Sequence, residues 1–230
     1  MTKNNLKRIA APKKWDIQRK KIRFITKPKA GAFPLEKGLA IGVILRDYLD
    51  YSKTMKESKY MINNQDILVN NVKIKDIHHI VGLMDIISIP LINKFFRLLL
   101  TKKGKLVLNE VNKEESQKLP LKVLGITILK KDKRQLNLSA GRTLITIKKD
   151  HKPGDTIIFD LKSKKIKDHF KLKEDNFVYL TDGKHVGESG LIEKIQNNTI
   201  KVKTKKGSLE SVKHYAFVLG NQKNTITLHK

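Results

Sequence analysis

The chain has 230 residues, with 49 Lys or Arg against 22 Asp or Glu, so its formal net charge is +27 at pH 7. Because a compact protein tolerates such self-repulsion when a polyanion neutralises it, we expect nucleic acid as the partner rather than a membrane, for which the sequence offers neither a basic helix with a large apolar face nor a lipidation motif. The absence of Cys excludes disulfides, thiolate nucleophiles and Cys-bearing zinc sites, and the absence of a signal peptide or of a bilayer-spanning apolar run predicts a cytoplasmic protein.

The chain begins with a basic extension, which we place at residues 1–37. Within residues 1–30 eleven basic residues stand against one acid, a net charge of +10, and such a segment repels itself. Its apolar residues are too scattered to bury a face, so we expect the extension to order only against a partner. Trp15 either stacks on an exposed base or sugar or packs against the rest of the protein, and the sequence leaves both readings open. The other predicted RNA contacts of the extension are Lys7, Arg8, Lys13, Lys14, Arg19, Lys21 and Arg23.

A helix is predicted from Gly38 onward, because apolar residues recur there at helical spacing. Thr54 followed by Glu57 fits a capping box, in which each side chain satisfies a free backbone N–H, at the start of a second helix. This second helix is short and is expected to end by residue 63 or 64. The apolar positions of the first helix are Ile41, Ile44, Leu45, Tyr48 and Leu49.

A tight hairpin is predicted over residues 67–74, where apolar residues flank Asn70 and Asn71 on both sides. Asn tolerates the positive φ that a two-residue primed turn requires, although Gly at Asn71 would be the stronger signal. Another strand is expected over residues 82–89, before Pro90 interrupts it. The basic residues expected to form an RNA-binding face on this helix-hairpin unit are Arg46, Lys53, Lys56, Lys59 and Lys73.

Beyond Pro90 nearly every segment reads as a short strand, with turn signals about every eight to twelve residues, which is typical of small sandwiches and barrels. A final unit from about Asn176 has the size of a five-strand barrel, and the tail after it offers one more strand. Arg142, which follows Gly141 among the central strands, is a weaker RNA-binding candidate. The predicted strands read FFRLLL, KLVLNEV, LKVLGITIL, RQLNL, TLITIK and DTIIFDL, then FVYL, LIEKI, NTIKVKT, SLESV and YAFVLG, with a KKG turn before SLESV.

The stretch TDGKHVGESGL, residues 181–191, contains three Gly and one Lys but fails the phosphate-loop pattern G-x-x-x-x-G-K-[ST]. The sequence after it is typical of a strand rather than of the helix that a dinucleotide site needs. We therefore predict a turn between two strands, in which Gly183 permits the turn and Gly187 a close approach to RNA or protein. Lys184 and His185 are expected at the tip, where RNA phosphate or another protein can meet them.

Patterns for catalysis and metal binding are missing from the sequence. The seven His show no HExxH or similar ligand spacing, and each is expected at the surface or facing RNA. No pair of acids and no nucleophile elbow can be proposed. We therefore predict a protein that is not an enzyme, with no cofactor, no metal and no small-molecule substrate.

Several stretches together resemble one protein family, the small-subunit ribosomal protein S-four-e family of archaea and eukaryotes. The resemblance is carried by LKRIAAPKKW at 6–15, by the region from ILRDYLDYSKTMKESKYM at 44–61 to GLMDIISI at 82–89, and by YLTDGKHVGESGLIEKI at 179–195. It runs nearly end to end and in the same order. Further matching stretches are LNLSAGRTL at 136–144, PGDTIIFDL at 153–161 and YAFVLG at 215–220.

The resemblance implies an α+β fold that is mostly β. It assigns residues 38–100 to the helix-helix-hairpin RNA-binding module named after ribosomal protein S-four, 101–174 to a central β-barrel-like domain, and 175–230 to an SH3-like barrel with a KOW motif. It also implies a structural constituent of the small ribosomal subunit that binds and stabilises folded rRNA, beside neighbouring ribosomal proteins. Asn71 and Gln65 stand where the family often has Gly, and the chain lacks the longer basic tail of eukaryotic members, which favours an archaeal protein.

Two other functions stay open. Helix-hairpin modules of this kind also occur in RNA-modifying enzymes of the pseudouridine synthase type, although the strands here are too few and too short for their catalytic domain. KOW units also occur in transcription elongation factors, so the protein can alternatively be a free RNA-binding regulator.

Overall fold

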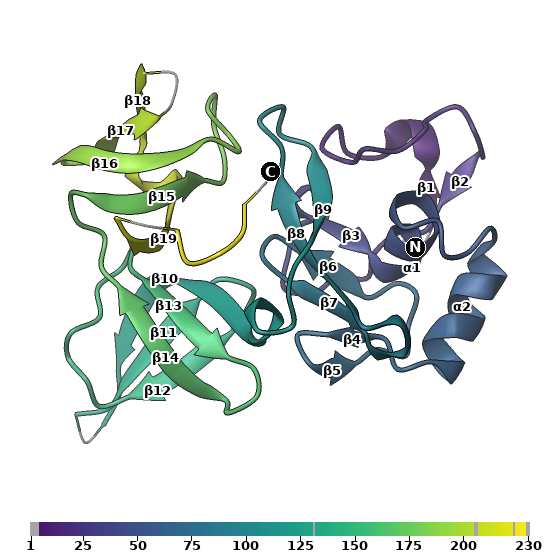
Figure 1. The fold of residues 1–230 in the computed structure, drawn as a ribbon, viewed down its shortest axis with the longest axis horizontal. Coiled ribbons are helices and arrows are strands. Elements are labelled where there is room, and N and C mark those ends of the chain that lie inside the picture. The colour runs from purple at the N-terminus through teal and green to yellow at the C-terminus, as the bar shows by residue number, and fades with distance from the viewer. Residues whose placement is uncertain (1–4, 131, 205–206, 223, 229–230) are drawn as a thin grey trace. The chain divides into compact units, whose positions relative to one another are not determined.

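The structure, a computed structural model, describes residues 5–130, 132–204, 207–222 and 224–228 (Figure 1). The first four residues of the predicted extension and the lysines of the predicted turn at 205–206 lie outside this part. The chain forms two compact units. Unit 1 comprises Met1–Leu99 and Lys105–Gln117, and unit 2 comprises Leu100–Gly104 and Lys118–Lys230. Among the described residues, no helix is long and apolar enough to cross a membrane.

The basic extension is folded as part of unit 1. Strand β1 (Leu6–Lys7) pairs antiparallel with β2 (Phe24–Ile25), and Trp15 forms an isolated bridge with Leu106. Trp15 and Ile25 are buried, with exposed fractions of 1% and 5%. The expectation that this segment buries no face and orders only against a partner is therefore wrong. The face that Trp15 packs on comes from a distant part of the chain, which the local pattern of apolar residues does not show.

Two short helices follow strand β3 (Gly38–Ala40). Helix α1 (Ile41–Val43) continues as a π-helical turn over Ile44–Tyr48, which the N–H of Leu49 closes on the carbonyl of Ile44 at 3.0 Å. Helix α2 (Met55–Asn64) ends where the sequence predicts.

The predicted capping box is present at the start of α2. The hydroxyl oxygen of Thr54 accepts the N–H of Glu57 at 3.3 Å, and the Glu57 carboxylate accepts the N–H of Lys53 at 2.8 Å. The carboxylate thus reaches one residue further back than the standard pattern. The bond from Lys53, and then the bond that the Thr54 hydroxyl donates to Glu57 Oε1 at 3.1 Å, hold the pKa of Glu57 below its usual range.

The predicted hairpin is formed by β4 (Leu68–Val69) and β5 (Val72–Lys73), with Asn70 and Asn71 at φ 50° and 62°. The strand predicted over 82–89 is instead two strands, β6 (Ile80–Gly82) and β7 (Ile86–Ile89), because Met84 adopts a φ of 69° that no strand contains. Strands β8 (Lys94–Leu100) and β9 (Leu106–Glu110) complete the sheet. Its order is β5-β4-β7-β8-β9, while β3 and β6 form a separate pair.

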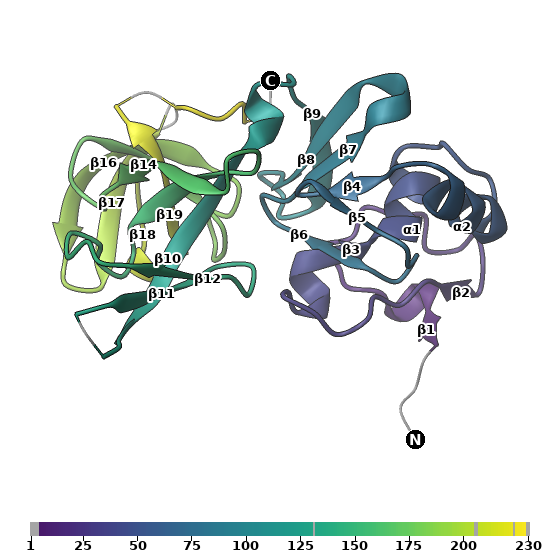
Figure 2. The same cartoon turned by 90° about the horizontal axis from the view of Figure 1, so that it is seen from below.

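Unit 2 contains two five-stranded sheets, of which the first has the order β12-β11-β10-β13-β14. The long strand β10 pairs with β13 through its first half and with β11 through its second, and a bulge between Val123 and Gly125 separates the halves. Such a bulge bends the strand, and Figures 1 and 2 show the sheet curled. Strand β14 is exposed along most of its length, so its sequence lacks the apolar alternation from which a strand is predicted. The bounds are β10 (Lys118–Ile128), β11 (Arg134–Leu138), β12 (Thr143–Thr146), β13 (Thr156–Asp160) and β14 (Lys165–Phe170).

The second sheet has the order β18-β17-β16-β15-β19, and its five strands agree with the number expected. The further strand expected in the tail is not formed by the described residues 222 and 224–228. The fold as a whole is mostly β with two short helices. The bounds are β15 (Asn176–Leu180), β16 (Ser189–Gln196), β17 (Thr199–Thr204), β18 (Gly207–Val212) and β19 (Ala216–Asn221).

Candidate nucleic-acid interface

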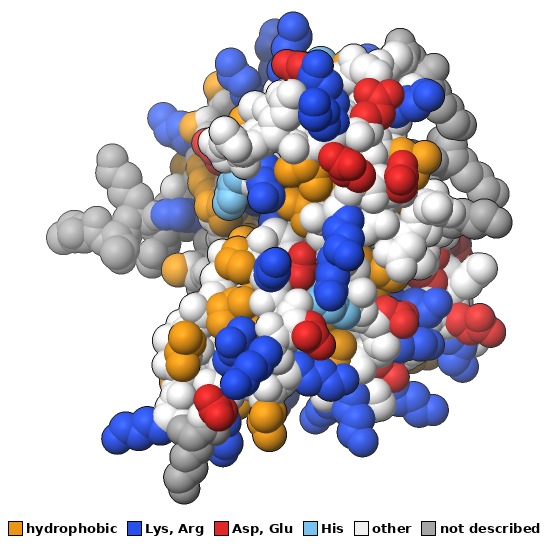
Figure 3. Space-filling model, turned by 90° about the vertical axis from the view of Figure 1, so that its left-hand side faces the viewer, with side chains coloured by type: hydrophobic (Ala, Val, Ile, Leu, Met, Phe, Trp, Pro, Cys, Tyr) orange, Lys and Arg blue, Asp and Glu red, His pale blue; other side chains and the backbone are white. Residues whose placement is uncertain are grey.

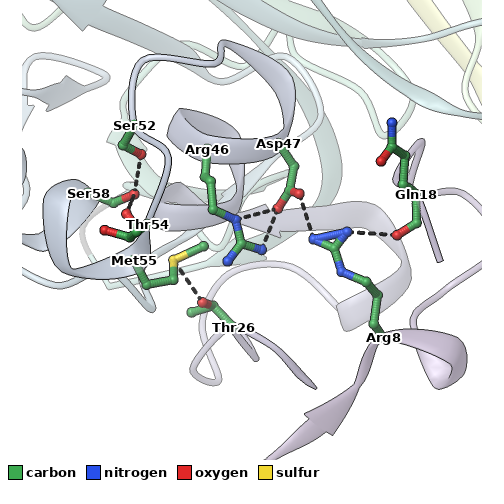
Figure 4. Close-up of polar contacts among 9 residues, drawn as sticks. All are labelled: Arg8, Gln18, Thr26, Arg46, Asp47, Ser52, Thr54, Met55 and Ser58. Atoms are coloured by element: carbon green, nitrogen blue, oxygen red, sulfur yellow. Dashed lines mark hydrogen bonds and ion pairs between the residues drawn. The ribbon is translucent and has the colours of Figure 1, made fainter. Parts of the chain in front are cut away.

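Arg8 is not available as a phosphate contact, because its guanidinium lies inside unit 1 (Figure 4). Its Nη2 donates to Asp47 Oδ1 at 2.5 Å and its Nη1 to the carbonyl of Gln18 at 2.7 Å, and the residue is only 1% exposed. Arg46 donates to the other Asp47 oxygen from Nε and Nη2, at 3.1 and 2.7 Å. One carboxylate thus joins two guanidinium groups, and this cluster locks the extension onto the first helix.

Two more predicted residues of the extension serve its own packing. Trp15 is buried, so the reading in which it packs against the protein holds and stacking on a base does not. Arg19 donates to the carbonyls of Ala11 and Pro12 at 2.7 and 2.8 Å, which closes a loop of the extension. The side chains left exposed or half-exposed are those of Lys7, Lys13, Lys14, Lys21 and Arg23.

Helix α2 brings together the best-defined group of basic side chains. Lys56 and Lys59 are exposed and lie three residues apart, so they share one side of the helix, and the exposed Lys53 precedes it. Tyr60, 68% exposed, lies one turn after Lys56. The prediction missed this aromatic ring, although its place directly after Lys59 on the exposed side of a short helix was a usable signal.

The remaining basic candidates of unit 1 are partly neutralised. Lys73 Nζ lies 2.5 Å from Asp66 Oδ1, so the charge at the hairpin is shared within the protein. Arg46 is 10% exposed at its side chain and is held by Asp47.

A cavity of about 570 Å³ lies between the end of the extension and β6. It is lined by Phe33 and Ile80 together with His78, whose ring nitrogen Nδ1 meets the carbonyl of Lys27 at 2.8 Å. The cavity belongs to the packing of the extension and contains none of the predicted RNA-binding residues.

In unit 2 the glycine-rich turn has the predicted form. Gly183 and Gly187 have φ values of 86° and 77°, and Lys184 at the tip is exposed while His185 is half-buried. A Cβ on Gly187 would lie 2.3 Å from the carbonyl oxygen of Thr101, so the close approach that this glycine permits is to protein backbone.

Arg142 follows a turn in which Ala140 and Gly141 have positive φ, and its carbonyl accepts the N–H of Leu138 at 2.8 Å. A backbone role in this turn accounts for its position. On the face shown in Figure 3 the Lys and Arg side chains are interleaved with acidic and hydrophobic ones and form no single patch.

Among the histidines that the structure describes, His151 differs most clearly from the expectation. His151 is buried, at 5% exposed, and its ring packs edge-on against His169 with centroids 4.4 Å apart. Burial also lowers the pKa of the half-buried His79. No group of three or more His, Asp or Glu that could hold a metal ion is found in the described ranges.

Comparison with known proteins follows the chain from end to end. The model of "Ribosomal family S4e" matches residues 92–166, and that of the "RS4NT (NUC023) domain" matches residues 2–36. The small ribosomal subunit protein eS4 of Methanosphaera stadtmanae is 39% identical over 233 residues, covering 99% of this chain and 96% of the relative. The eS4 protein of Methanocella arvoryzae is 36% identical over 226 residues, covering 96% and 95%.

A solved structure gives the same match at the level of the fold. The crystal structure of the 30S ribosomal protein S4e from Thermoplasma acidophilum superposes with a TM-score of 0.71 at 29% identity. The superposition covers 82% of this chain and 97% of that one, so nearly all of that fold is present here.

Proposed function

Since the chain belongs to the ribosomal protein S4e family, we propose that it is a structural constituent of the small ribosomal subunit, which binds and stabilises folded small-subunit rRNA. The observation that carries this proposal is the 39% identity over 99% of the chain to an archaeal eS4 protein. The protein is not an enzyme, and its place is the ribosome in the cytoplasm. The named relatives are archaeal, which agrees with the source expected from the sequence.

The binding is electrostatic in the first place. Folded rRNA packs phosphates closely, and each Lys or Arg that neutralises a phosphate releases condensed counterions. The net charge of +27 supplies this driving force, and a residue can contribute only if its side chain reaches the surface. The residues that we propose as rRNA contacts are Lys7, Lys13, Lys14, Lys21, Arg23, Lys53, Lys56, Lys59, Lys73, Arg142, Lys184 and His185, with Tyr60 as a stacking partner beside the α2 lysines.

We also propose that residues 38–100 form the S-four-type RNA-binding module and residues 175–230 a KOW-containing SH3-like barrel. Two short helices followed by the β4–β5 hairpin support the first assignment. The five-stranded second sheet of unit 2, with a glycine-rich turn between β15 and β16, supports the second. The basic extension 1–37 and the central domain 101–174 complete this division, except that residues 105–117 fold with unit 1, where β9 completes the sheet of the module.

The two other functions are not favoured. An RNA-modifying enzyme carries a catalytic domain in addition to the helix-hairpin module, whereas 99% of this chain aligns with a small ribosomal subunit protein. A free regulator would share only the KOW unit with this protein, and the similarity extends from the extension through the central strands.

Sedimentation of a cell lysate at high salt tests the proposal. We expect the protein to migrate in stoichiometric amount with the small subunit, because a ribosomal constituent is also held by packing within the folded subunit, whereas binding through phosphate contacts alone weakens steeply as salt rises. Release into the soluble fraction would identify a free regulator, and base modification of naked rRNA by the purified protein would identify an enzyme.

A further inference from the structure

The first sheet of unit 2 has a groove between its two edge strands. A cavity of about 440 Å³ is lined by residues of β12 and of β14, which stand at opposite ends of the strand order. The sheet therefore curls until its edges face each other without closing. Isoleucines stand on both walls, Ile145 on β12 at 65% exposed and Ile166 on β14 at 38%.

The lining of this groove is rich in positive charge. Two aspartates stand against four exposed lysines, which come from the segment after β12, from the β13–β14 turn and from β14 itself. Strand β14 is bulged at Lys167, because its register with β13 passes from Asp168 directly to Ile166. Bulges commonly re-aim a side chain beside a binding site. The lysines are Lys148, Lys164, Lys165 and Lys167, and the aspartates are Asp150 and Asp168.

The floor of the groove contains a buried side chain with unmet hydrogen-bonding capacity. His151 is 5% exposed, lines the groove, and has no hydrogen-bond partner for Nδ1 or Nε2 among the described residues. Buried polar groups of native proteins are paired in the great majority of cases, and an unpaired one calls for a ligand, a water or a functional role. A neutral imidazole carries one N–H donor, so the ring can serve an anionic oxygen.

The neighbouring His169 does not supply the missing hydrogen bond of His151, because its own ring is bound to Asp155. His169 Nε2 donates to Asp155 Oδ2 at 2.9 Å. The Asp155 carboxylate is itself fixed by the N–H groups of Lys152 and Leu172, each at 2.9 Å. Burial and then the proximity of His169 lower the pKa of His151. An anion in the groove would act in the opposite direction.

We propose that this groove binds the phosphodiester backbone of a single RNA strand, with His151 and the lysines contacting phosphate oxygens and Ile145 and Ile166 contacting the sugars. The proposal rests on the proposed function and adds an RNA-binding site on the first sheet of unit 2. An RNA strand carries a negative charge at every nucleotide between apolar faces of sugar and base, which matches lysines that alternate with exposed isoleucines. A peptide would match this lining only if its acidic residues were spaced to meet the lysines and its apolar residues to meet the isoleucines.

The test records the NMR signals of the His151 ring in the full chain. Overall RNA affinity cannot report on the groove, because other basic surfaces of the protein also bind RNA. Ring nitrogen signals of ¹⁵N-labelled protein are recorded against pH, alone and with a single-stranded oligouridylate. We expect the RNA to shift the His151 signals and to raise its pKa by about one unit, as an opposite charge at contact distance does. Unchanged His151 signals at saturating RNA would overturn the proposal.

Two charge-matched double variants locate the effect. Lys165→Gln with Lys167→Gln removes two lysines of the groove, whereas Lys171→Gln with Lys173→Gln removes two exposed lysines that lie outside it. We expect the first pair to raise the RNA concentration that gives half of the His151 shift about tenfold, which corresponds to the loss of about one charge-assisted hydrogen bond, and the second pair to raise it less than twofold. Equal effects of the two pairs would refute the groove as the site.

Two further probes identify the ligand class. Inorganic phosphate and a decaglutamate peptide are titrated at the same phosphate or carboxylate concentration as the RNA. A His151 shift of equal size with either one overturns the assignment to an RNA strand, in favour of a free-anion site or a peptide site respectively. If the protein sediments with the small subunit but the His151 signals stay silent, this inference fails alone, whereas failure to sediment with the subunit refutes the proposed function.

Discussion

Lys122 is a buried cation whose contacts tie two parts of unit 2 together. Its ammonium group donates to the carbonyls of His214 and Ala216 at 2.7 and 2.6 Å, which joins β10 to the start of β19. Burial lowers its pKa to about 8. The tie therefore carries an electrostatic penalty that depends on pH.

Because this pKa is about 8 in the folded protein and about 10.5 when the residue is exposed, the unfolded chain binds more protons between these values. Burial of the charged Lys122 destabilises the folded protein fully below pH 8. This destabilisation disappears as the pH rises toward 10.5, so the free energy of unfolding increases over that range. We expect Lys122→Met to flatten this rise by up to about 3 kcal/mol, at 1.4 kcal/mol per unit of pKa. Urea unfolding of both proteins at pH 7.5 and 10 measures the difference, and parallel changes in the two would contradict it.

Arg8 provides a test of structural against RNA-binding roles in the extension. We expect Arg8→Ala to lower the free energy of unfolding by about 2 to 4 kcal/mol, because it leaves Asp47 with one of its two guanidinium partners. Lys13→Ala, at an exposed position nearby, should change stability by less than about 0.5 kcal/mol. If Arg8→Ala instead weakens rRNA binding at unchanged stability, the buried assignment is wrong.

Asn70 and Asn71 share a turn conformation but not an environment. Asn70 donates to Asp85 at 2.7 Å and accepts the N–H of Ile86 at 3.0 Å, whereas Asn71 makes one exposed bond to Gln117. Asn70→Gly should therefore cost about 2 kcal/mol through the lost buried bonds, and Asn71→Gly less than about 0.5 kcal/mol. Thermal unfolding of the two variants checks this, and equal losses would contradict it.

At the scale of elements, the predictions that hold are those that depend on neighbours within a few positions. The capping box at Thr54, the end of α2 and the Asn70–Asn71 hairpin are of this kind. The extension was misjudged because its partners lie far along the chain: Arg8 binds Asp47, and Trp15 meets Leu106. Residue type predicts Arg8 as an RNA contact and leaves Trp15 open between a base and the protein core, since Arg and Trp occur in both settings.

The exposed lysines of α2 make a quantitative prediction about binding. Lys56→Gln with Lys59→Gln should reduce the slope of log affinity for rRNA against log salt by about 1.4 to 1.8, which is two phosphates at about 0.7 to 0.9 each. Lys75→Gln with Lys113→Gln, two exposed lysines of unit 1 outside the proposed contacts, should reduce it by clearly less. Filter binding over a range of KCl gives both slopes, and equal reductions would remove the special role of α2.

The whole molecule is dominated by its charge. At +27 the folded chain repels itself more than the expanded unfolded chain does, and salt screens this repulsion. We expect the thermal midpoint of the free protein to rise when KCl is increased from about 50 to 500 mM, where the Debye length falls from about 14 to 4 Å. Calorimetry at the two salt concentrations measures the shift, and an unchanged or lower midpoint would show that the repulsion is already relieved by the 22 acids.

The fold class, the number of strands in the last sheet and the family follow from composition, short-range pattern and resemblance. The division into two compact units does not, because it depends on which distant segments meet. The chain passes from unit 1 to unit 2 after Leu99, returns at Lys105 and leaves again after Gln117. The groove of the central sheet was likewise invisible, since it needs the curl that brings β12 and β14 face to face.

The five residues Leu100–Gly104 are joined to the rest of unit 2 by two hydrogen bonds of one buried side chain. The Tyr179 hydroxyl, buried in that unit, donates to the carbonyl of Leu100 at 2.7 Å and accepts its N–H at 2.9 Å. During synthesis these residues leave the ribosome well before Tyr179. The backbone groups of Leu100 therefore stay without these two hydrogen bonds until the second half of the chain has been made. A gene fragment that encodes residues 118–230 alone omits Leu100 and leaves the Tyr179 hydroxyl without both hydrogen bonds. This limits the fragments of the protein that can be produced separately.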